Sequence, residues 1–160
     1  MNLQILGFRG NISSVKDTLD FIDSIKKDSE IIQLLNADAV AGKKHIMHGV
    51  NQAFLAFERD ENFANDLSVE ICLRCSAQKQ ISKAFDLLGL KEGFMNICMV
   101  LINCNDYTSQ LSSKFILDDS VLLPNEDILK EIYSIDDSEL KILDMENILI
   151  DRISKLTVDY

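Results

Sequence analysis

Residues 96–103 (NICMVLIN) form the segment that most constrains the fold of this chain. Apolar side chains fall on both of the faces that alternate along a strand, which predicts a central strand buried on both sides. Such a strand requires helices against each face of its sheet. A length of 160 residues also suits one domain. We therefore expect residues 1–160 to form a single α/β (α+β) domain, with a central mixed β-sheet flanked by helices.

The remaining segments alternate between extended and helical patterns. Residues 67–75 place Leu67, Val69 and Ile71 on one side of a predicted strand, opposite polar or small residues. Other extended segments are expected at residues 3–8, 31–40, 114–117 and 121–123. Apolar residues at helical spacing predict helices at residues 15–27, 43–59, 81–88 and 126–133, and a last helix from 138 or 144 to about 158.

The N-terminus lacks the charged and apolar regions of a signal peptide. No apolar run reaches the roughly 18–20 residues that span a bilayer, so we expect a cytoplasmic protein without a membrane partner. The four cysteines lie among apolar residues, as is typical of reduced, buried thiols. Their spacing, Cys72-x2-Cys75 followed by Cys98-x5-Cys104, leaves a zinc site as an alternative, although the strand pattern of residues 67–75 disfavours it.

No catalytic constellation can be recognised in the chain. Its two histidines, His45 and His48, lie in a window without any acidic residue, and neither a phosphate-binding glycine loop nor a nucleophile elbow is present. The many C-terminal acids are typical of a solvated surface. We therefore predict no catalytic residue, no metal and no cofactor, and expect a protein that is not an enzyme.

The formal net charge of -10 is unevenly distributed. Residues 117–151 hold 11 acidic residues against two basic ones, whereas residues 39–57 and 71–85 hold no acid at all. These two acid-free windows contain five bases, Lys43, Lys44, Arg74, Lys79 and Lys83. Acidic proteins repel nucleic acid as a whole, but a chain polarised in this way can still bind it locally.

Residues 76–80 (SAQKQ) connect an expected strand to an expected helix. The first backbone amides of a helix lack internal partners and can bind phosphate, and hydroxyl and amide side chains can read bases and sugars. Aromatic residues that could stack on bases are scarce in both windows. An ordinary capped helix with surface lysines explains the same residues, and the sequence pattern alone does not decide between the two.

Two groups of residues resemble the small kinase-binding subunit of the KEOPS complex, the PRPK-binding protein (TPRKB) family. The first group comprises residues 36–38 (NAD), Ala41-x-Lys43-Lys44-His45 and residues 50–53 (VNQA). The second is Glu70-Ile71-x3-Cys75-Ser76-Ala77-Gln78-x-Gln80-Ile81-x2-Ala84, followed by Gly89. The resemblance covers roughly residues 31–104. Ala77 stands where this family usually has glycine, and Gly49 where alanine is usual.

The resemblance implies a non-catalytic subunit of the complex that installs threonylcarbamoyl groups on tRNA adenosine. It implies that a PRPK-type atypical kinase is a direct partner and that a threonylcarbamoyl transferase is an indirect one. It also implies capture of the tRNA 3′ CCA end. Together with the charge pattern it gives the expected tRNA-binding residues Lys43, Lys44, His45, Arg74, Ser76, Ala77, Gln78, Lys79, Gln80, Ile81 and Lys83. A stand-alone small-molecule- or zinc-binding domain is the alternative.

The last helix has an apolar stripe wider than packing on one core requires. We therefore expect it to be shared with the kinase partner, through Leu55, Ile148, Leu149, Ile150 and Ile153. Glutamate at Leu149 or Ile153 is then expected to abolish partner binding and leave the fold intact. Nothing in the chain indicates an oligomer, so a monomer is expected outside the complex.

Overall fold

The computed structural model describes residues 1–158 and contains one four-stranded sheet in this range. Its strands are β1 (Leu3–Ile12), β2 (Ile31–Asn36), β3 (Gly93–Ile102) and β4 (Ile116–Leu117), in the order β2-β3-β1-β4. All three neighbouring pairs are antiparallel, so the α+β class is confirmed and the expected mixed sheet is wrong. Strands that run in the same direction, β1 with β2 and β3 with β4, are each separated by a strand of opposite direction and never pair.

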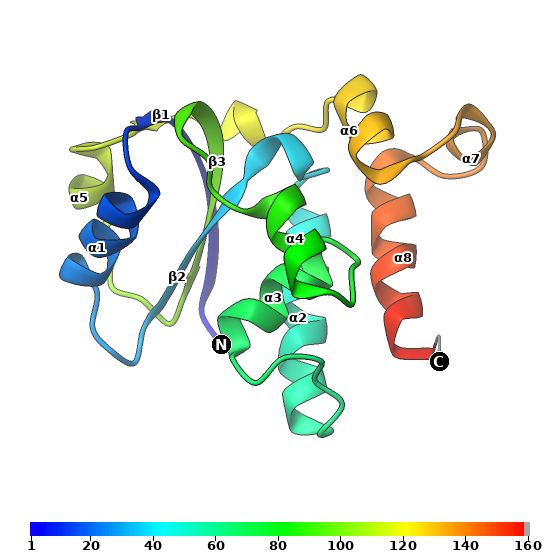
Figure 1. The fold of residues 1–160 in the computed structure, drawn as a ribbon, viewed down its shortest axis with the longest axis horizontal. Helices are drawn as coiled ribbons and strands as arrows, with labels where there is room; N and C mark the ends of the chain where they lie inside the picture. Colours follow the sequence, from blue (N-terminus) through cyan, green and yellow to red (C-terminus); the bar gives the residue numbers. More distant parts are fainter. Residues whose placement is uncertain (159–160) are drawn as a thin grey trace.

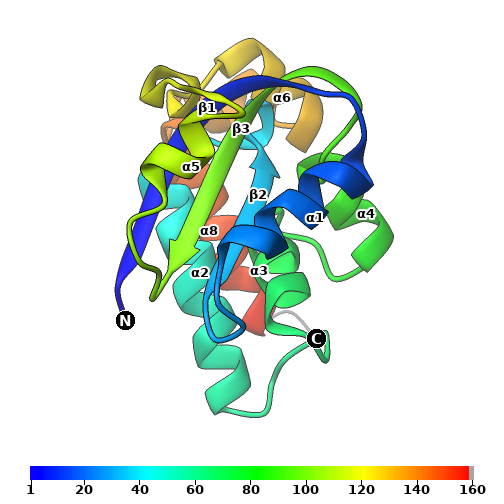
Figure 2. The ribbon, with the colours of Figure 1, turned by 90° about the vertical axis from the view of Figure 1, so that its left-hand side faces the viewer.

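Helices cover both faces of the sheet (Figures 1 and 2). On one face, Cys98, Val100 and Ile102 of β3 pack with α2 (Lys43–Glu58), α3 (Leu67–Cys75), α4 (Ile81–Leu88) and α8 (Met145–Val158). On the other, Ile97, Met99 and Leu101 pack with α1 (Val15–Ile25) and α5 (Thr108–Ser112). The expectation of a central strand buried on both faces is confirmed.

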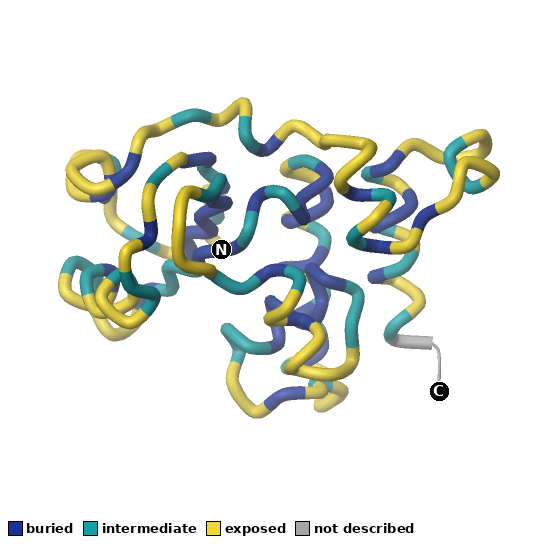
Figure 3. Tube along the Cα trace, turned by 45° about the horizontal axis from the view of Figure 1, so that its top comes forward, coloured by how far each residue is buried: buried dark blue, intermediate teal, exposed yellow. Residues whose placement is uncertain are grey.

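The remaining elements lie near the predicted positions with some differences. Helix α6 (Glu126–Tyr133) begins and ends as predicted. Helix α7 (Asp137–Leu140) is a separate short helix, and α8 begins one residue after the later of the two expected starts. The strand predicted at residues 31–40 ends at Asn36, because a 3-10 turn occupies Ala37–Ala39. The extended piece predicted at residues 121–123 is wrong, because a 3-10 turn occupies Asp119–Leu122. Buried residues concentrate in the middle of the molecule, whereas the outer turns are exposed (Figure 3).

The largest difference concerns residues 67–75, which form helix α3 and not a strand. The Asp66 carboxylate caps this helix by accepting hydrogen bonds from the N–H groups of Ser68 and Val69. All residues from Glu70 to Cys75 are buried, so the helix has no solvent face after its first turn and its apolar residues there need not follow helical spacing. Glu70 and Arg74, one turn apart, form an ion pair inside the protein.

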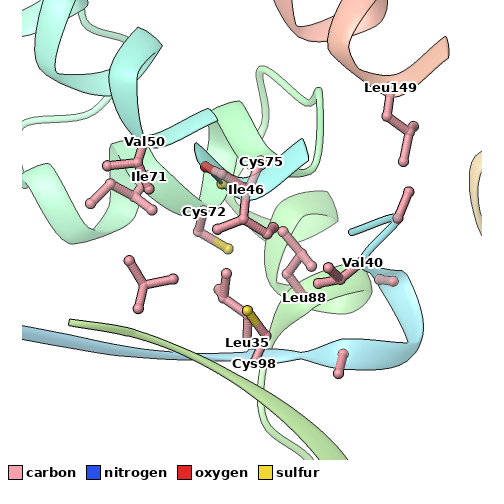
Figure 4. Packing of buried hydrophobic residues seen from close by; sticks show 14 of the residues in the cluster. Leu35, Val40, Ile46, Val50, Ile71, Cys72, Cys75, Leu88, Cys98 and Leu149 are labelled. Atoms are coloured by element: carbon pink, nitrogen blue, oxygen red, sulfur yellow. Dashed lines mark hydrogen bonds between the residues drawn. The ribbon is translucent and has the colours of Figure 1, made fainter. Parts of the chain in front are cut away.

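The core between the sheet and its larger helical layer joins residues from distant parts of the chain (Figure 4). Leu35 and Cys98 from the sheet face Ile46 and Val50 of α2, while Leu149 of α8 closes the opposite side. Within the described residues, no helix is both long enough and apolar enough to cross a membrane.

Candidate functional site

The start of α2 carries the first pair of predicted cationic residues. Gly42 precedes the helix with φ of 115°, a left-handed conformation in which a side chain would collide with the Glu146 carboxylate. That carboxylate, from the first turn of α8, accepts a 3.4 Å hydrogen bond from the His45 N–H and complements the helix dipole. Lys43 and Lys44, which follow Gly42, are both exposed. Lys43 Nζ lies 3.7 Å from an Asp119 carboxylate oxygen.

The His45 imidazole joins the two acid-free windows. Its Nδ1 accepts a 3.0 Å hydrogen bond from the Ala41 N–H, and its Nε2 donates to the Cys75 carbonyl over 2.7 Å. Burial lowers the pKa of His45 to about 4, so the ring is neutral at pH 7. The Tyr133 ring packs against it in a T-shaped contact, and the Tyr133 hydroxyl donates to the Ala39 carbonyl. His45 therefore positions the start of α2 against the end of α3.

The loop between α3 and α4 begins with a helix-terminating motif. The Gln78 N–H donates to the Leu73 carbonyl and the Ala77 N–H to the Arg74 carbonyl, each over 3.0 Å, which is the Schellman arrangement. Ala77 takes the left-handed position of this motif with φ of 54°. Glycine adopts this conformation without strain, whereas alanine pays about 1–2 kcal/mol. This conformational preference explains why glycine is usual at this position in the family that the sequence resembles.

Gly49, the second departure from the family pattern, lies on α2 against Cys75 at the end of α3. A Cβ atom at this position would stand 2.5 Å from Cys75 Sγ and 3.0 Å from Cys75 Cα. Alanine does not fit against this cysteine without movement of one helix. The glycine thus maintains the distance at which His45 reaches the Cys75 carbonyl.

Arg74 does not point into solvent as predicted from its position in a basic window. Its side chain is 1% exposed, pairs with Glu70 over 2.7 Å and donates to the Glu61 carbonyl over 3.2 Å. The guanidinium also stacks on the Phe63 ring, 4.3 Å from its centroid. The second Glu70 carboxylate oxygen accepts from the Ala64 N–H. Arg74 therefore fastens the loop after α2 to α3.

The predicted tRNA-binding residues fall into three groups by exposure. His45, Arg74 and Ser76 are buried and bonded within the protein, so we reassign them from ligand contact to support of the surface. Ala77 and Gln78 are half-buried. The exposed residues are Lys43, Lys44, Lys79, Gln80, Ile81 and Lys83. We call these six residues the cationic surface.

The predicted partner residues of α8 mostly face the protein's own core. Ile148, Leu149 and Ile153 are buried, so the expectation that Leu149→Glu or Ile153→Glu leaves the fold intact is not compatible with their positions. Ile150 and Leu55 are half-buried. His48 of α2 bonds Ser154 of α8 over 2.8 Å, which aligns the two helices side by side.

Leu55 lies two turns after His48 on the same side of α2, and Ile150 lies one turn before Ser154 on the same side of α8. We call Leu55, His48, Ile150 and Ser154 the α2–α8 seam. Asp151, next to Ile150 on α8, is exposed and pairs with Lys155 over 2.8 Å. A seam with partly covered apolar side chains and an acidic border suits contact with another protein.

Burial dominates the chemistry of the cysteines. It raises the pKa of Cys72 and of Cys98 to about 12 and that of Cys75 well above its ordinary value, which keeps these thiols protonated. Among the described residues, no three or more His, Cys, Asp or Glu side chains gather in a way that could hold a metal ion.

The structure thus defines a single α+β domain with six exposed candidate residues and a seam between α2 and α8. Comparison with known proteins gives the particular family. A family model described as "Kinase binding protein CGI-121" matches residues 11–156, and the chain belongs to this family. It is also 39% identical over 110 residues to a protein of Methanocaldococcus jannaschii named "Regulatory protein Cgi121", covering 64% of this chain and 70% of that relative.

Proposed function

We propose that this protein is a non-catalytic, cytoplasmic subunit of the KEOPS tRNA-modifying complex that binds tRNA through its cationic surface. In this complex it binds and stimulates a PRPK-type atypical kinase and meets the threonylcarbamoyl transferase only indirectly. The observation that carries the RNA-binding part is the His45 bridge from Ala41 to Cys75. It sets the lysines at the start of α2 beside the loop that leads into α4.

The ligand chemistry follows from these groups. Lys43, Lys44 and Lys83 supply positive charge for phosphates, while Gln80 and the loop backbone offer hydrogen bonds to sugars and bases. A flexible single strand fits such a short surface better than a rigid duplex, since its backbone can follow the loop. We therefore propose the single-stranded tRNA 3′ CCA end as the part that binds here.

The kinase is proposed to contact the α2–α8 seam. The family is one of kinase-binding proteins, and the seam offers apolar side chains at Leu55 and Ile150 with acids beside them. The acid-rich C-terminal third would then face a basic partner surface, which is the arrangement that speeds association. This places the proposed kinase and RNA contacts on different parts of α2.

One observation favours the alternative of a small-molecule-binding domain. A cavity of about 390 Å³ lies between α1, β2, α3 and α4, with lining residues that include Leu19, Leu34 and Phe85. The side-chain oxygen of Gln33, which also lines it, is buried without a hydrogen-bond partner. An apolar molecule with one hydrogen-bond donor would suit this cavity.

Reversing two charges tests the proposed RNA contact. We expect Lys43→Glu/Lys44→Glu to weaken binding of tRNA at least about tenfold at low salt and to reduce the salt slope by about 1.4, for two lost phosphate contacts on a single strand. Filter binding across a salt series measures both quantities.

The matched control is Lys16→Glu/Lys155→Glu, which makes the same change in net charge at exposed positions of α1 and α8. It should leave binding close to that of the unchanged protein. Equal losses in both double variants would mean that only net charge matters, and the cationic surface would not be the contact.

A further inference from the structure

The sheet face that carries the main core continues to an uncovered end. In the register of β1 and β3, Arg9 lies opposite Asn96 and Asn11 opposite Phe94. These residues alternate on the same face as Cys98 and Val100, beyond the point where helices cover it. Phe94 is 91% exposed, the largest exposed fraction among the bulky apolar side chains of the described residues. Such an aromatic on a sheet surface needs an explanation.

Polar groups surround this phenylalanine in a shallow hollow of about 250 Å³. Its lining includes Arg9, Asp38, Phe94 and Asn96. The Asn96 side-chain amide donates to the Asp38 carboxylate over 3.2 Å, which brings the carboxylate to the sheet surface. Arg9 is half exposed and pairs with Asp118 over 2.8 Å. A pair as exposed as this contributes little to stability, so the Arg9 guanidinium can turn away from Asp118 toward a phosphate.

The hollow adjoins the cationic surface. Asp118 binds Arg9, while its neighbour Asp119 lies 3.7 Å from Lys43 and accepts a hydrogen bond from the Gly7 N–H. Gly7 is two residues before Arg9 and therefore on the same face of β1. Arg9 and Lys43 thus pair with two consecutive residues of one turn, Asp118 and Asp119. The hollow and the cationic surface meet at this turn. In Figure 1 the start of β3 and the turns around residues 40 and 120 all lie along the upper edge.

We propose that this hollow is a nucleobase site, in which Phe94 stacks on a base of the RNA end and Arg9 binds the adjoining phosphate. The proposal rests on the proposed RNA-binding function and extends it. Every base offers an aromatic face, so stacking on the 91% exposed Phe94 supplies a platform of the kind that is scarce in the two acid-free windows. The positive charge of Arg9 then fixes the strand beside the ring.

The Asp38 carboxylate gives the site an orientation and a preference. It repels phosphate, so the backbone lies on the Arg9 side and the base edge on the Asp38 side. A carboxylate accepts hydrogen bonds from exocyclic amino groups, which cytosine and adenine carry and uracil lacks. The site is therefore expected to favour cytosine or adenine over uracil.

The chain contains no tryptophan, so Phe94→Trp introduces a single fluorescent reporter at the site. Titration with a short RNA ending in CCA should quench its fluorescence, and the same RNA ending in uridines should quench it less at equal concentration. Ile142→Trp, at a position 83% exposed in the acidic C-terminal third, should show no quenching. Phe94→Ala should lower the affinity for the CCA-ending RNA about tenfold.

The outcomes separate this inference from the function on which it rests. Undiminished affinity of Phe94→Ala, together with loss of binding in Lys43→Glu/Lys44→Glu, would overturn the nucleobase site and leave the RNA-binding function in place. No RNA binding by the unchanged protein would overturn both. A tryptophan signal that responds to the kinase and not to RNA would make Phe94 a protein contact, which also overturns the proposal.

Discussion

Arg74→Ala is expected to lower the free energy of unfolding by about 3–5 kcal/mol, because it leaves the Glu70 carboxylate charged and buried without its partner. Glu70 is fully buried and Arg74 is 1% exposed, so the pair is shielded from water in the folded protein. The variant also loses the guanidinium stacked on Phe63 and the bond to the Glu61 carbonyl. Urea denaturation followed by circular dichroism measures the change.

The paired replacement Glu70→Leu/Arg74→Met is the control. Because it removes both charges and keeps similar volumes, we expect it to recover much of the stability. RNA binding by Arg74→Ala, measured beside its stability, tests separately whether Arg74 supports the fold or contacts the ligand. If Arg74→Ala unfolded at the same urea concentration as the unchanged protein and lost only RNA affinity, Arg74 would be a ligand contact, and the supporting role assigned to it would be wrong.

Leu149→Glu is expected to unfold the protein, at a cost of about 4 kcal/mol or more. Leu149, on α8, is fully buried in the core between the sheet and its larger helical layer. A carboxylate at this position has no partner within the core. The loss of thermal unfolding cooperativity in calorimetry checks this. Any failure of this variant to bind the kinase then reports on folding and not on the interface.

Ile150→Glu is the informative neighbour for the partner surface. Ile150 is half-buried on the α2–α8 seam, so glutamate can reach solvent and the fold should persist. We expect this variant to keep a cooperative unfolding transition and to fail to co-purify with the kinase. Kinase binding retained by Ile150→Glu and by Leu55→Glu would place the interface elsewhere.

The central strand could be predicted from the sequence because apolar residues occupy both of its alternating faces. This pattern indicates burial on both sides whichever helices pack against the strand. Helix α3 could not be predicted from alternation, since it is surrounded by the protein and buries polar and apolar residues alike. Two signals were nevertheless present in its sequence. Asp66 is a preferred helix-capping residue, and Glu70 and Arg74 stand at the spacing of a helical ion pair.

The exposed lysines of the candidate site could be found by locating charge along the chain. The supporting contacts could not, because His45 bonds to Ala41 and to Cys75, which lies 30 residues away. The same limit applies to Phe94. A single aromatic outside both basic windows has no distinguishing pattern until strand register places it opposite Asn11, near Arg9 and Asn96.

The most direct test of the RNA-binding claim compares tRNA that carries its CCA end with the same tRNA after removal of those three nucleotides. Binding of the unchanged protein is measured by filter retention at one salt concentration. We predict affinity for the intact tRNA about tenfold or more above that for the truncated one, from stacking and phosphate contacts at the end. Equal affinity for both, or none for either, would contradict capture of the tRNA 3′ end by this protein.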